Sequence, residues 1–238
     1  MNTRIVEVRA KVLRQNDLLA YALRDSFRAS GVSVISLVSS PGSGKTTFLE
    51  KLLSVLAPEF RVAALVGDLA TENDASRLRR ATPNVRQITT GTICHLDAQM
   101  IKRALEGWRL DALDFLFIEN VGNLVCPSSY DLGEELRFLL LSATEGEDKP
   151  LKYPTIFNSS DVAIITKMDM AEAAEFDAAA ARRNIEGVRP GMQIFEVSAK
   201  TGLGMPHVFQ FLRDTKSSNA QVAEAFPRAG NLQSTNKA

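Results

Sequence analysis

The segment Val38–Thr47, with the sequence VSSPGSGKTT, constrains the fold of this chain more than any other segment does. It follows an apolar, strand-like run, Val32–Val38, and precedes a helical pattern whose apolar side chains fall on one face: Phe48, Leu49, Leu52, Leu53 and Leu56. A strand, a glycine-rich loop and a helix in this order are typical of a phosphate-binding loop. Gly42 and Gly44 let the backbone turn so that its N–H groups converge on phosphate oxygens.

Side chains at the end of this loop can contact a bound nucleotide. Lys45 can reach the outer phosphates, and Thr46 can place its hydroxyl on a magnesium ion. One position departs from the pattern GxxxxGK[ST], since the leading glycine is replaced by Ser39. The alternative is a glycine-rich turn that binds nothing, but a strand and a helix flank the loop as phosphate binding requires. We therefore expect nucleotide contacts from Gly42, Ser43, Gly44, Lys45, Thr46 and Thr47.

Strands and helices alternate along the rest of the chain. Further strands are expected at Arg61–Val66, Val85–Ile88, Leu113–Ile118, Phe138–Thr144, Val162–Thr166 and Gln193–Val197. Helices are expected at residues 5–29, Asp74–Arg80, Leu96–Glu106, Glu172–Arg183 and Met205–Asp214. Largely apolar strands separated by helices predict an α/β fold in which helices cover both faces of a predominantly parallel sheet.

The chain has 238 residues, which fits one domain with two short extensions. Residues 1–31 are expected to form an amphipathic N-terminal helix that ends at Gly31. Residues 32–216 are expected to form the nucleotide-binding domain. Residues 217–238 are polar and lack periodicity, so we expect a mobile tail there.

Charge and hydrophobicity exclude several classes of function. The 28 basic and 28 acidic residues balance, whereas a general nucleic-acid binder usually carries a basic surface. No apolar run approaches the roughly 20 residues that span a bilayer. The N-terminal sequence, MNTRIVEVRAKVLRQND, is too charged for a secretory signal peptide. We therefore expect a cytoplasmic protein that binds neither nucleic acid nor membranes.

Acidic residues follow two of the strands, at the edge of the sheet where folds of this kind bind ligands. Asp68 is expected to approach magnesium directly or through water. Asp74 either positions the attacking water or is an ordinary carboxylate at a helix terminus. Glu119 stands where the acidic residue of a Walker B strand does, and Gly122 then has the spacing of a switch loop that senses the terminal phosphate. The expected catalytic residues are Lys45, Asp68 and Asp74, and the expected magnesium ligands are Thr46, Asp68 and Glu119.

Two later segments resemble base-binding loops. The sequence IITKMD, Ile164–Asp169, is a variant of the NKxD element with Thr166 in place of asparagine. Asp169 can accept two hydrogen bonds from the guanine N1–H and 2-amino groups, which adenine cannot supply, and Lys167 can lie along the base. The sequence VSAKTG follows the next strand and adds three expected contacts, Ser198, Ala199 and Lys200. The order favours GTP over ATP, although Lys167 and Asp169 could also form only an exposed ion pair.

The two cysteines of the chain, Cys94 and Cys126, lie in loops at the nucleotide end of the sheet, and His95 follows the first. Each cysteine alone could be a small buried apolar residue. Together the three side chains offer two thiolates and an imidazole, a donor set suited to nickel or zinc. Three ligands leave a coordination position open or invite ligands from a second subunit. The remaining histidine, His207, is expected to be a surface or capping residue.

Taken together, these residues resemble the HypB family within the SIMIBI class of P-loop GTPases, over roughly Val32 to Phe211. The segments that carry the resemblance are SSPGSGKTT, GDLATENDA, ITTGTICHLDA, IENVGNLVCPSSYDLG, TEGEDKPLKYP and SAKTG. The resemblance implies slow GTP hydrolysis to GDP, with Mg²⁺, coupled to nickel delivery into the large subunit of [NiFe] hydrogenase. It also implies a GTP-favoured homodimer, a shared metal site at Cys94, His95 and Cys126 that accepts nickel or zinc, and a nickel-binding partner, the maturation factor HypA.

Departures from the family pattern narrow this expectation. Some members begin with a CxxCGC motif and others carry a His-rich stretch, but this chain has neither, which argues against nickel storage. The urease accessory GTPases are similar in the first loop, but their metal motif is Cys-Pro-His, whereas Cys126-Pro127 is followed here by Ser128.

Two functions of different classes also fit a phosphate-binding loop. One is a non-enzymatic metal-binding adaptor that nucleotide only stabilises, and the second is a small-molecule kinase, for which the sequence shows no convincing arginine-bearing lid.

The short path from Gly122 to Cys126 suggests how nucleotide and metal are coupled. If the terminal phosphate orders the loop that begins at Glu119, the thiolate of Cys126 should move with it. Pro127 biases Cys126 toward an extended backbone, which would help to transmit that movement.

Overall fold

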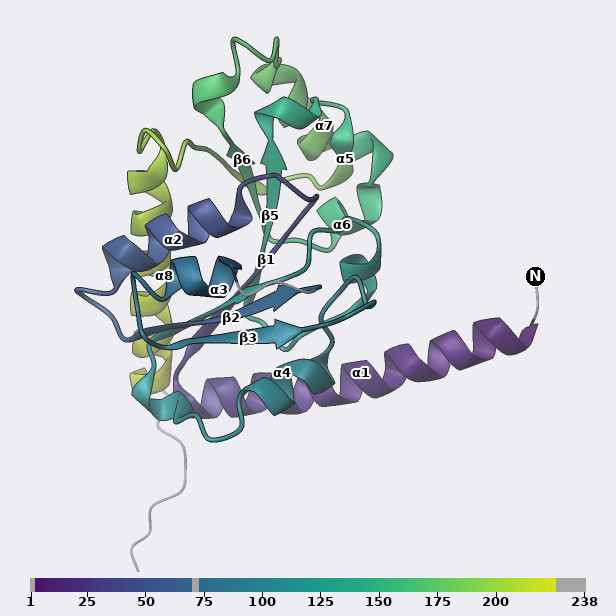
Figure 1. Ribbon diagram of the computed structural model, residues 1–238, viewed down its shortest axis with the longest axis vertical. Helices are drawn as coiled ribbons and strands as arrows, with labels where there is room; N and C mark the ends of the chain where they lie inside the picture. The colour runs from purple at the N-terminus through teal and green to yellow at the C-terminus, as the bar shows by residue number, and fades with distance from the viewer. Residues whose placement is uncertain (1–2, 70–72, 226–238) are drawn as a thin grey trace, which may run out of the picture.

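A computed structural model describes residues 3–69 and 73–225 of the chain. The described part contains one seven-stranded sheet, in the order β3-β2-β4-β1-β5-β6-β7, and every pair of neighbouring strands is parallel (Figure 1). The strands are β1 Ser33–Ser39, β2 Val62–Asp68, β3 Val85–Thr89, β4 Phe115–Glu119, β5 Leu136–Ser142, β6 Val162–Thr166 and β7 Gln193–Glu196. The predicted parallel α/β sheet is thus confirmed.

Helices cover both faces of this sheet. They are α1 Thr3–Ser30, α2 Lys45–Leu56, α3 Asn73–Leu78, α4 Ala98–Ala104, α5 Lys149–Lys152, α6 Pro154–Asn158, α7 Ala178–Val188 and α8 Met205–Ala225. Short 3-10 turns are η1 Leu110–Ala112, η2 Cys126–Ser129, η3 Ala143–Glu145 and η4 Met168–Met170. One core cluster joins α2, α3 and α8 to one face, and two clusters join α1 with α4, and α6 with α7, to the opposite face. None of the described helices is both long and apolar enough to cross a bilayer.

Alternating side chains of the central strand β1 feed these clusters. Ile35 and Leu37 pack on the α2 and α8 side, whereas Val34 and Val38 pack on the opposite side. This alternation follows from the period of two along a strand, and burial on both faces explains why β1 reads as a nearly continuous apolar run. Ser36 shares a face with Val34 and Val38, so it is a polar group inside an otherwise apolar layer.

The central position of β1 brings the predicted site segments together. Its neighbours are β4 and β5, and all strands point the same way, so the loops after β1, β4 and β5 emerge at one edge. In register, Leu37 of β1 lies beside Glu119 of β4. The loop before α2 and the acidic end of β4 are far apart in the sequence. They meet because β1 and β4 are neighbours in the sheet.

Several predicted boundaries were wrong. Helix α7 begins only at Ala178, because Asp177 caps it by accepting a hydrogen bond from Ala180 N at 2.9 Å and the preceding residues form turns. Helix α4 likewise begins after Asp97, which accepts from Met100 N at 2.7 Å. Strand β5 begins and ends earlier than expected. It ends at Ser142 because the side chain of that residue caps the following 3-10 turn.

The predicted end of the last helix is also corrected, because α8 continues to Ala225 instead of ending at Asp214. The hydroxyls of Ser217 and Ser218 donate to carbonyls four residues earlier, which lets these polar residues stay in the helix. Lys216 Nζ donates to Gly31 O at 2.7 Å and to Asp114 O at 2.9 Å, which ties α8 to the base of the sheet. The remainder of the predicted tail, residues 226–238, lies outside the described residues.

Candidate functional site

The phosphate-binding loop joins β1 to α2, as the sequence predicted. Gly42 and Gly44 adopt φ angles of 76° and 94°, in the region that side chains other than glycine rarely occupy. Gly44 stands at the N-cap of α2, so the first N–H groups of that helix face the loop. Ser43 and Lys45 are buried, and Thr46 and Thr47 follow in the first turn of the helix. The geometry is that of an anion site at a helix N-terminus.

Ser39, which replaces the usual leading glycine, braces this loop from within. Its Oγ accepts hydrogen bonds from Lys45 Nζ at 2.8 Å and Ser43 Oγ at 2.5 Å, and donates to Ser40 O at 2.6 Å. A hydroxyl thus supplies contacts that a glycine could not. Burial lowers the pKa of Lys45, although the charges of Glu119, Asp74 and Glu145 oppose this effect.

Glu119 contacts the phosphate-binding loop at Thr46, which is also predicted to hold magnesium. Thr46 Oγ1 donates to Glu119 Oε1 at 2.7 Å, while Glu119 Oε2 is buried without a hydrogen-bond partner among the described residues. Burial raises the pKa of Glu119 to about 7, Lys45 and the Thr46 hydroxyl oppose the shift, and Asp74 adds to it. A buried carboxylate oxygen beside a hydroxyl fits a magnesium ion, since Mg²⁺ prefers oxygen ligands.

The two remaining acidic residues lie near this pair. Asp68 ends β2, where its Oδ1 accepts a hydrogen bond from Leu69 N at 2.7 Å. Asp74 stands in the first turn of α3, which is the helix-terminal position expected in one of its two possible roles. Its charge nevertheless reaches Lys45 and Glu119, because it shifts the pKa of both. Asp74 therefore shares one electrostatic environment with Lys45 and Glu119.

The raised pKa of Glu119 predicts a pH dependence of stability in the nucleotide-free protein. Between its ordinary value of 4.5 and about 7, the folded chain keeps a proton that the unfolded chain releases. The free energy of unfolding should therefore fall as pH rises through this window, by on the order of 3 kcal/mol in total. In Glu119→Gln this component should be absent. Urea unfolding across the window checks the difference between wild type and variant.

Exposed Glu106 provides the matched control for this change. Glu106→Gln makes the same chemical change at an exposed position and should keep the wild-type pH profile. If the free energy of unfolding depends on pH in the same way in wild type and in Glu119→Gln, burial does not destabilise the Glu119 carboxylate.

The predicted base-binding loops lie directly over the phosphate loop. Thr166 Oγ1 donates to Ser43 O at 2.7 Å, and Lys167 Nζ donates to Gly42 O at 2.7 Å. Lys167 adopts φ 58°, an uncommon backbone that directs it here. Thr166, which stands in place of asparagine, therefore tethers the two loops. Asp169 is exposed and accepts from Ser198 Oγ at 2.6 Å, while Ala199 and Lys200 continue the second loop.

The three predicted metal ligands come together in the folded chain. One donor atom from each of Cys94, His95 and Cys126 lies within 4.8 Å of those of its two neighbours. The Cys94 thiol donates to the Cys126 sulfur at 3.0 Å, and both cysteines are free. All three side chains are partly exposed, so an ion can reach them. His207, by contrast, is exposed in the first turn of α8 and far from this cluster in the sequence.

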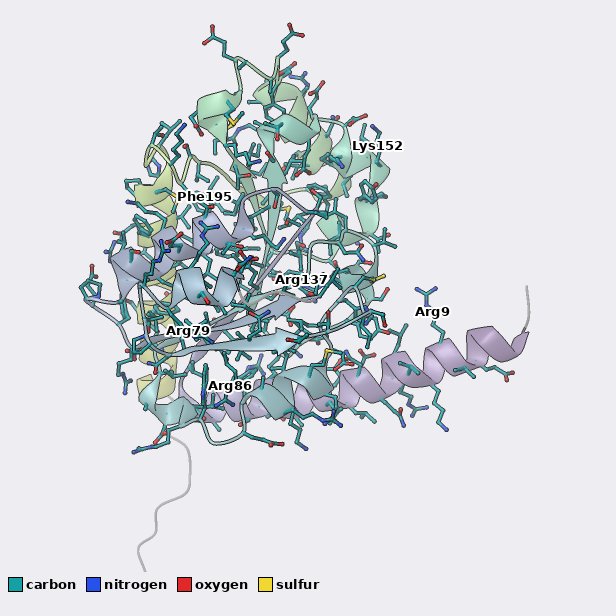
Figure 2. The ribbon with its side chains drawn as sticks, in the orientation of Figure 1. Arg9, Arg79, Arg86, Arg137, Lys152 and Phe195 are labelled. Carbon is teal, nitrogen blue, oxygen red and sulfur yellow. The ribbon has the colours of Figure 1, made fainter. Side chains whose placement is uncertain are left out.

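The protonation states of this cluster suit a soft divalent metal. Burial lowers the pKa of His95, which favours the neutral imidazole that binds metals. The hydrogen bond from Cys94 and burial raise the pKa of Cys126, which the Arg9 guanidinium on the protruding part of α1 opposes (Figure 2). A metal ion would replace the thiol proton, because thiolates are the form that coordinates.

Asparagines that the sequence did not assign hold the metal loops together. Asn123 Nδ2 donates to Cys94 O at 3.3 Å, and its Oδ1 accepts from Val125 N at 2.8 Å. Asn120 Oδ1 accepts from Leu96 N and Val121 N, both at 2.9 Å. Both asparagines stand in the loop that follows β4, so their side chains join this loop to the Cys94 loop.

Gly122 connects the same loop to the phosphate site. A Cβ atom at this position would lie 2.9 Å from Pro41 Cα in the phosphate-binding loop. Real Cβ atoms do not approach backbone so closely, so only glycine allows this contact. The loop between Gly122 and Cys126 therefore touches the nucleotide site at one end and the metal cluster at the opposite end.

Gly122→Ala should break this close approach. We expect a loss of about 1 to 3 kcal/mol in the free energy of unfolding and weaker GTP binding, because one of the two loops must move. Gly187→Ala is the matched control, since a Cβ at Gly187 in α7 meets nothing within 4 Å. The control should be neutral or slightly stabilising. Thermal unfolding and nucleotide titration check both variants, and equal behaviour would contradict the close contact.

Glu145 is a residue of the site that the sequence did not reveal. Its carboxylate accepts a hydrogen bond from Ser40 Oγ in the phosphate loop, and its Oε1 is buried without a partner among the described residues. The segment TEGED carries part of the family resemblance, but only the placement of β5 beside β1 brings it to the loop.

Known proteins are similar to this chain in sequence. A family model described as "CobW/HypB/UreG, nucleotide-binding domain" matches residues 33–196. The "Hydrogenase/urease maturation factor HypB" of Helicobacter hepaticus is 41% identical over 230 residues, which cover 95% of this chain and 94% of that relative. The "Hydrogenase maturation factor HypB" of Escherichia coli K12 is 44% identical over 209 residues, which cover 88% of this chain and 72% of that relative.

A solved structure shows the same similarity in three dimensions. The structure described as HypB from Helicobacter pylori in complex with nickel matches with a TM-score of 0.81 and 42% identity. The match covers 86% of this chain and 96% of that one.

Proposed function

This chain belongs to the CobW/HypB/UreG family, and within it to the HypB maturation factors, and from that premise we propose that it is a GTPase that delivers nickel. The observation that carries the proposal is the loop from Gly122 to Cys126. One end packs against Pro41 beside the phosphate-binding residues, and the opposite end supplies a donor atom to the Cys94, His95 and Cys126 cluster. Such a loop can make metal binding depend on the nucleotide.

GTP would bind on the residues from Gly42 to Thr47, with Lys45 neutralising charge on the outer phosphates during transfer. Thr46 and Glu119, aided by Asp68, would hold Mg²⁺, which supplies positive charge to the phosphate oxygens when bound. Asp74 would orient the attacking water. Asp169 and Ser198, which already hydrogen-bond at 2.6 Å, would read the guanine base beside Ala199 and Lys200. We propose that turnover is slow, as the resemblance to the family implies.

Nickel would be the cargo of the second site. The two thiolates and neutral imidazole of Cys94, His95 and Cys126 also suit zinc, which we propose as a competing ion. Three donors do not complete a tetrahedral or square-planar shell. A second copy of the chain, bound in the GTP state, would complete it, and separation after hydrolysis would open it.

The partners proposed for delivery follow from the family. A nickel-binding factor of the HypA type would exchange metal with the chain, and the large subunit of [NiFe] hydrogenase would be the acceptor. Urease maturation is the second candidate, because the Helicobacter hepaticus relative is described as a hydrogenase/urease factor. The nickel content of apo-hydrogenase and of apo-urease would be measured in the presence of the nickel-loaded chain. A rise in only one of the two enzymes would identify the acceptor.

The proposal is tested by metal release. Protein loaded with nickel and GTP should release the ion to a colorimetric chelator as phosphate appears, whereas a non-hydrolysable GTP analogue should retain it. Equal release with both nucleotides would overturn hydrolysis-coupled delivery. No phosphate in multiple-turnover assays would leave the non-enzymatic adaptor as the better description.

A further inference from the structure

The ring of Tyr130 stacks on the ring of His95. Their centroids are 4.0 Å apart and the ring planes are inclined by 32°. Tyr130 follows the 3-10 turn η2, so it lies after Cys126 in the chain and faces the histidine from the opposite loop. We propose that Tyr130 is a positioning residue that fixes the His95 imidazole for metal binding. This inference rests on the proposed metal site.

His95 needs such a contact because nothing else among the described residues orients its ring through Nδ1. A metal-binding histidine usually donates its second ring N–H to a carboxylate or carbonyl, which fixes the ring. Here the Nδ1 atom of His95 is buried without a hydrogen-bond partner in the described part of the chain. The aromatic contact with Tyr130 therefore holds a ring that no hydrogen bond from Nδ1 to the described residues orients. Its ring-on-ring geometry also restricts the imidazole to one tilt.

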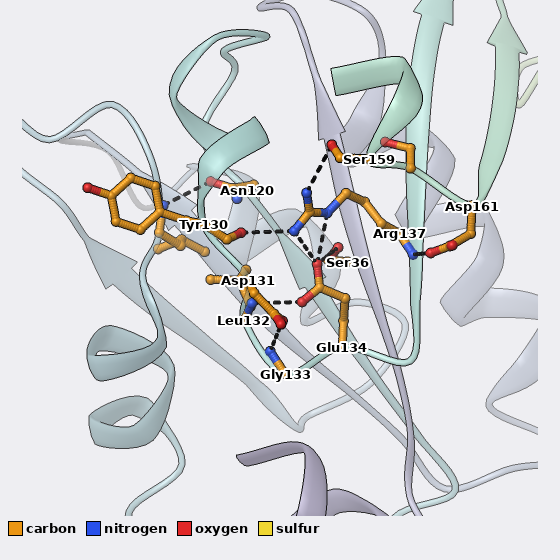
Figure 3. Close-up of polar contacts among 12 residues, drawn as sticks. Ser36, Asn120, Tyr130, Asp131, Leu132, Gly133, Glu134, Arg137, Ser159 and Asp161 are labelled. Carbon is orange, nitrogen blue, oxygen red and sulfur yellow. Dashed lines mark hydrogen bonds and ion pairs between the residues drawn. The ribbon is translucent and has the colours of Figure 1, made fainter. Parts of the chain in front are cut away.

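The backbone of Tyr130 is in turn fixed by a buried ion pair. Arg137 Nη2 donates to Tyr130 O at 2.8 Å and pairs with Glu134 Oε1 at 2.7 Å (Figure 3). Arg137 and Glu134 are only 8% and 7% exposed. Ser36 Oγ of β1 also donates to Glu134 Oε1 at 3.0 Å. The pair thus connects Tyr130 to the strand that ends in the phosphate-binding loop, between the two apolar clusters on that face of the sheet.

Helix α1 ties Tyr130's loop to the loop of His95. Buried Asn16 donates from Nδ2 to Asp131 O at 2.9 Å and accepts from Ala98 N at 2.9 Å. Arg24 Nη2 also donates to both carboxylate oxygens of Asp131, at 2.6 and 2.7 Å. Both rings therefore stand on segments whose backbones are braced. A rotation of His95 would have to displace the Tyr130 ring, whose backbone these contacts hold in place.

Substitution of the Tyr130 ring separates positioning from simple packing. Tyr130→Leu should lower nickel affinity about 10-fold or more and alter the thiolate-to-nickel charge-transfer absorption. Tyr130→Phe keeps the ring and should bind within about twofold of wild type. Titration with nickel chloride, visible absorption spectra and melting of the metal-free proteins measure these effects.

The outcomes distinguish the two proposals. If wild type binds nickel and Tyr130→Leu matches its affinity and spectrum, the positioning role is wrong while the metal site stands. If wild type and Cys94→Ala are equally indifferent to nickel, the metal site itself fails and this inference with it. Should Tyr130→Leu melt early in its metal-free form, Tyr130→Met keeps more reach in the side chain and replaces it; wild-type affinity in a well-folded Tyr130→Met would overturn the proposal.

Discussion

Replacing Lys45 with alanine is expected to lower the turnover number for GTP hydrolysis by about 100- to 1,000-fold. The Lys45 ammonium is buried at the end of the phosphate-binding loop, where its charge acts in a poorly solvated environment. The variant also removes the main positive charge that favours ionised Glu119, so the pKa of Glu119 should rise further and magnesium should bind more weakly. Phosphate release at saturating GTP measures the loss.

Lys51→Ala is the matched control for this prediction. Lys51 lies on the same helix but is exposed. It should hydrolyse GTP at the wild-type rate. Undiminished turnover in Lys45→Ala would show that the loop does not catalyse the reaction, and no turnover in wild type would favour a non-enzymatic adaptor.

The second large effect is expected at the metal cluster. Cys126→Ala removes one of two thiolates from a three-donor set and should lower nickel affinity by at least about 100-fold, more than the loss of an outer-shell partner costs. It should also abolish the dependence of the remaining affinity on nucleotide, because Cys126 is the donor on the loop that contacts Pro41. Since thiols must lose a proton to bind, wild-type affinity should rise with pH.

Ser128→Ala tests whether this loss is specific. Ser128 lies two residues further on in the same turn, and its Oγ donates to Val125 O at 2.7 Å. The variant should change stability slightly and leave metal affinity intact. A nucleotide-dependent metal affinity that survives Cys126→Ala would place the coupling elsewhere.

The alternation of strands and helices and the phosphate-binding loop could be predicted because both depend on local patterns. The run from Val32 to Val38 was predicted to be an apolar strand, and GSGKTT has a spacing with few competing interpretations. Helix boundaries were harder to predict. Polar residues such as Ser217 and Ser218 continue α8 through hydrogen bonds to the preceding turn, and composition alone does not reveal this.

The contacts that link the two sites could not be predicted from spacing. Gly122 has the spacing of a switch glycine, but its contact with Pro41 depends on β4 lying beside β1. Tyr130 and Glu145 carry no motif that points to His95 or to Ser40. Their contacts form only because strands that are distant in the sequence are neighbours in the sheet. The sequence pattern alone therefore does not predict them.

The most direct measurement is nickel affinity together with oligomeric state, in GDP and in a non-hydrolysable GTP analogue, for wild type and Cys94→Ala. Zinc titrations in parallel identify the competing ion. We expect a dimer with tighter nickel binding in the GTP analogue, weaker binding in GDP, and no effect of the nucleotide on nickel binding in Cys94→Ala. Nickel affinity that is the same in both nucleotides and unaffected by Cys94→Ala would contradict nucleotide-controlled metal delivery.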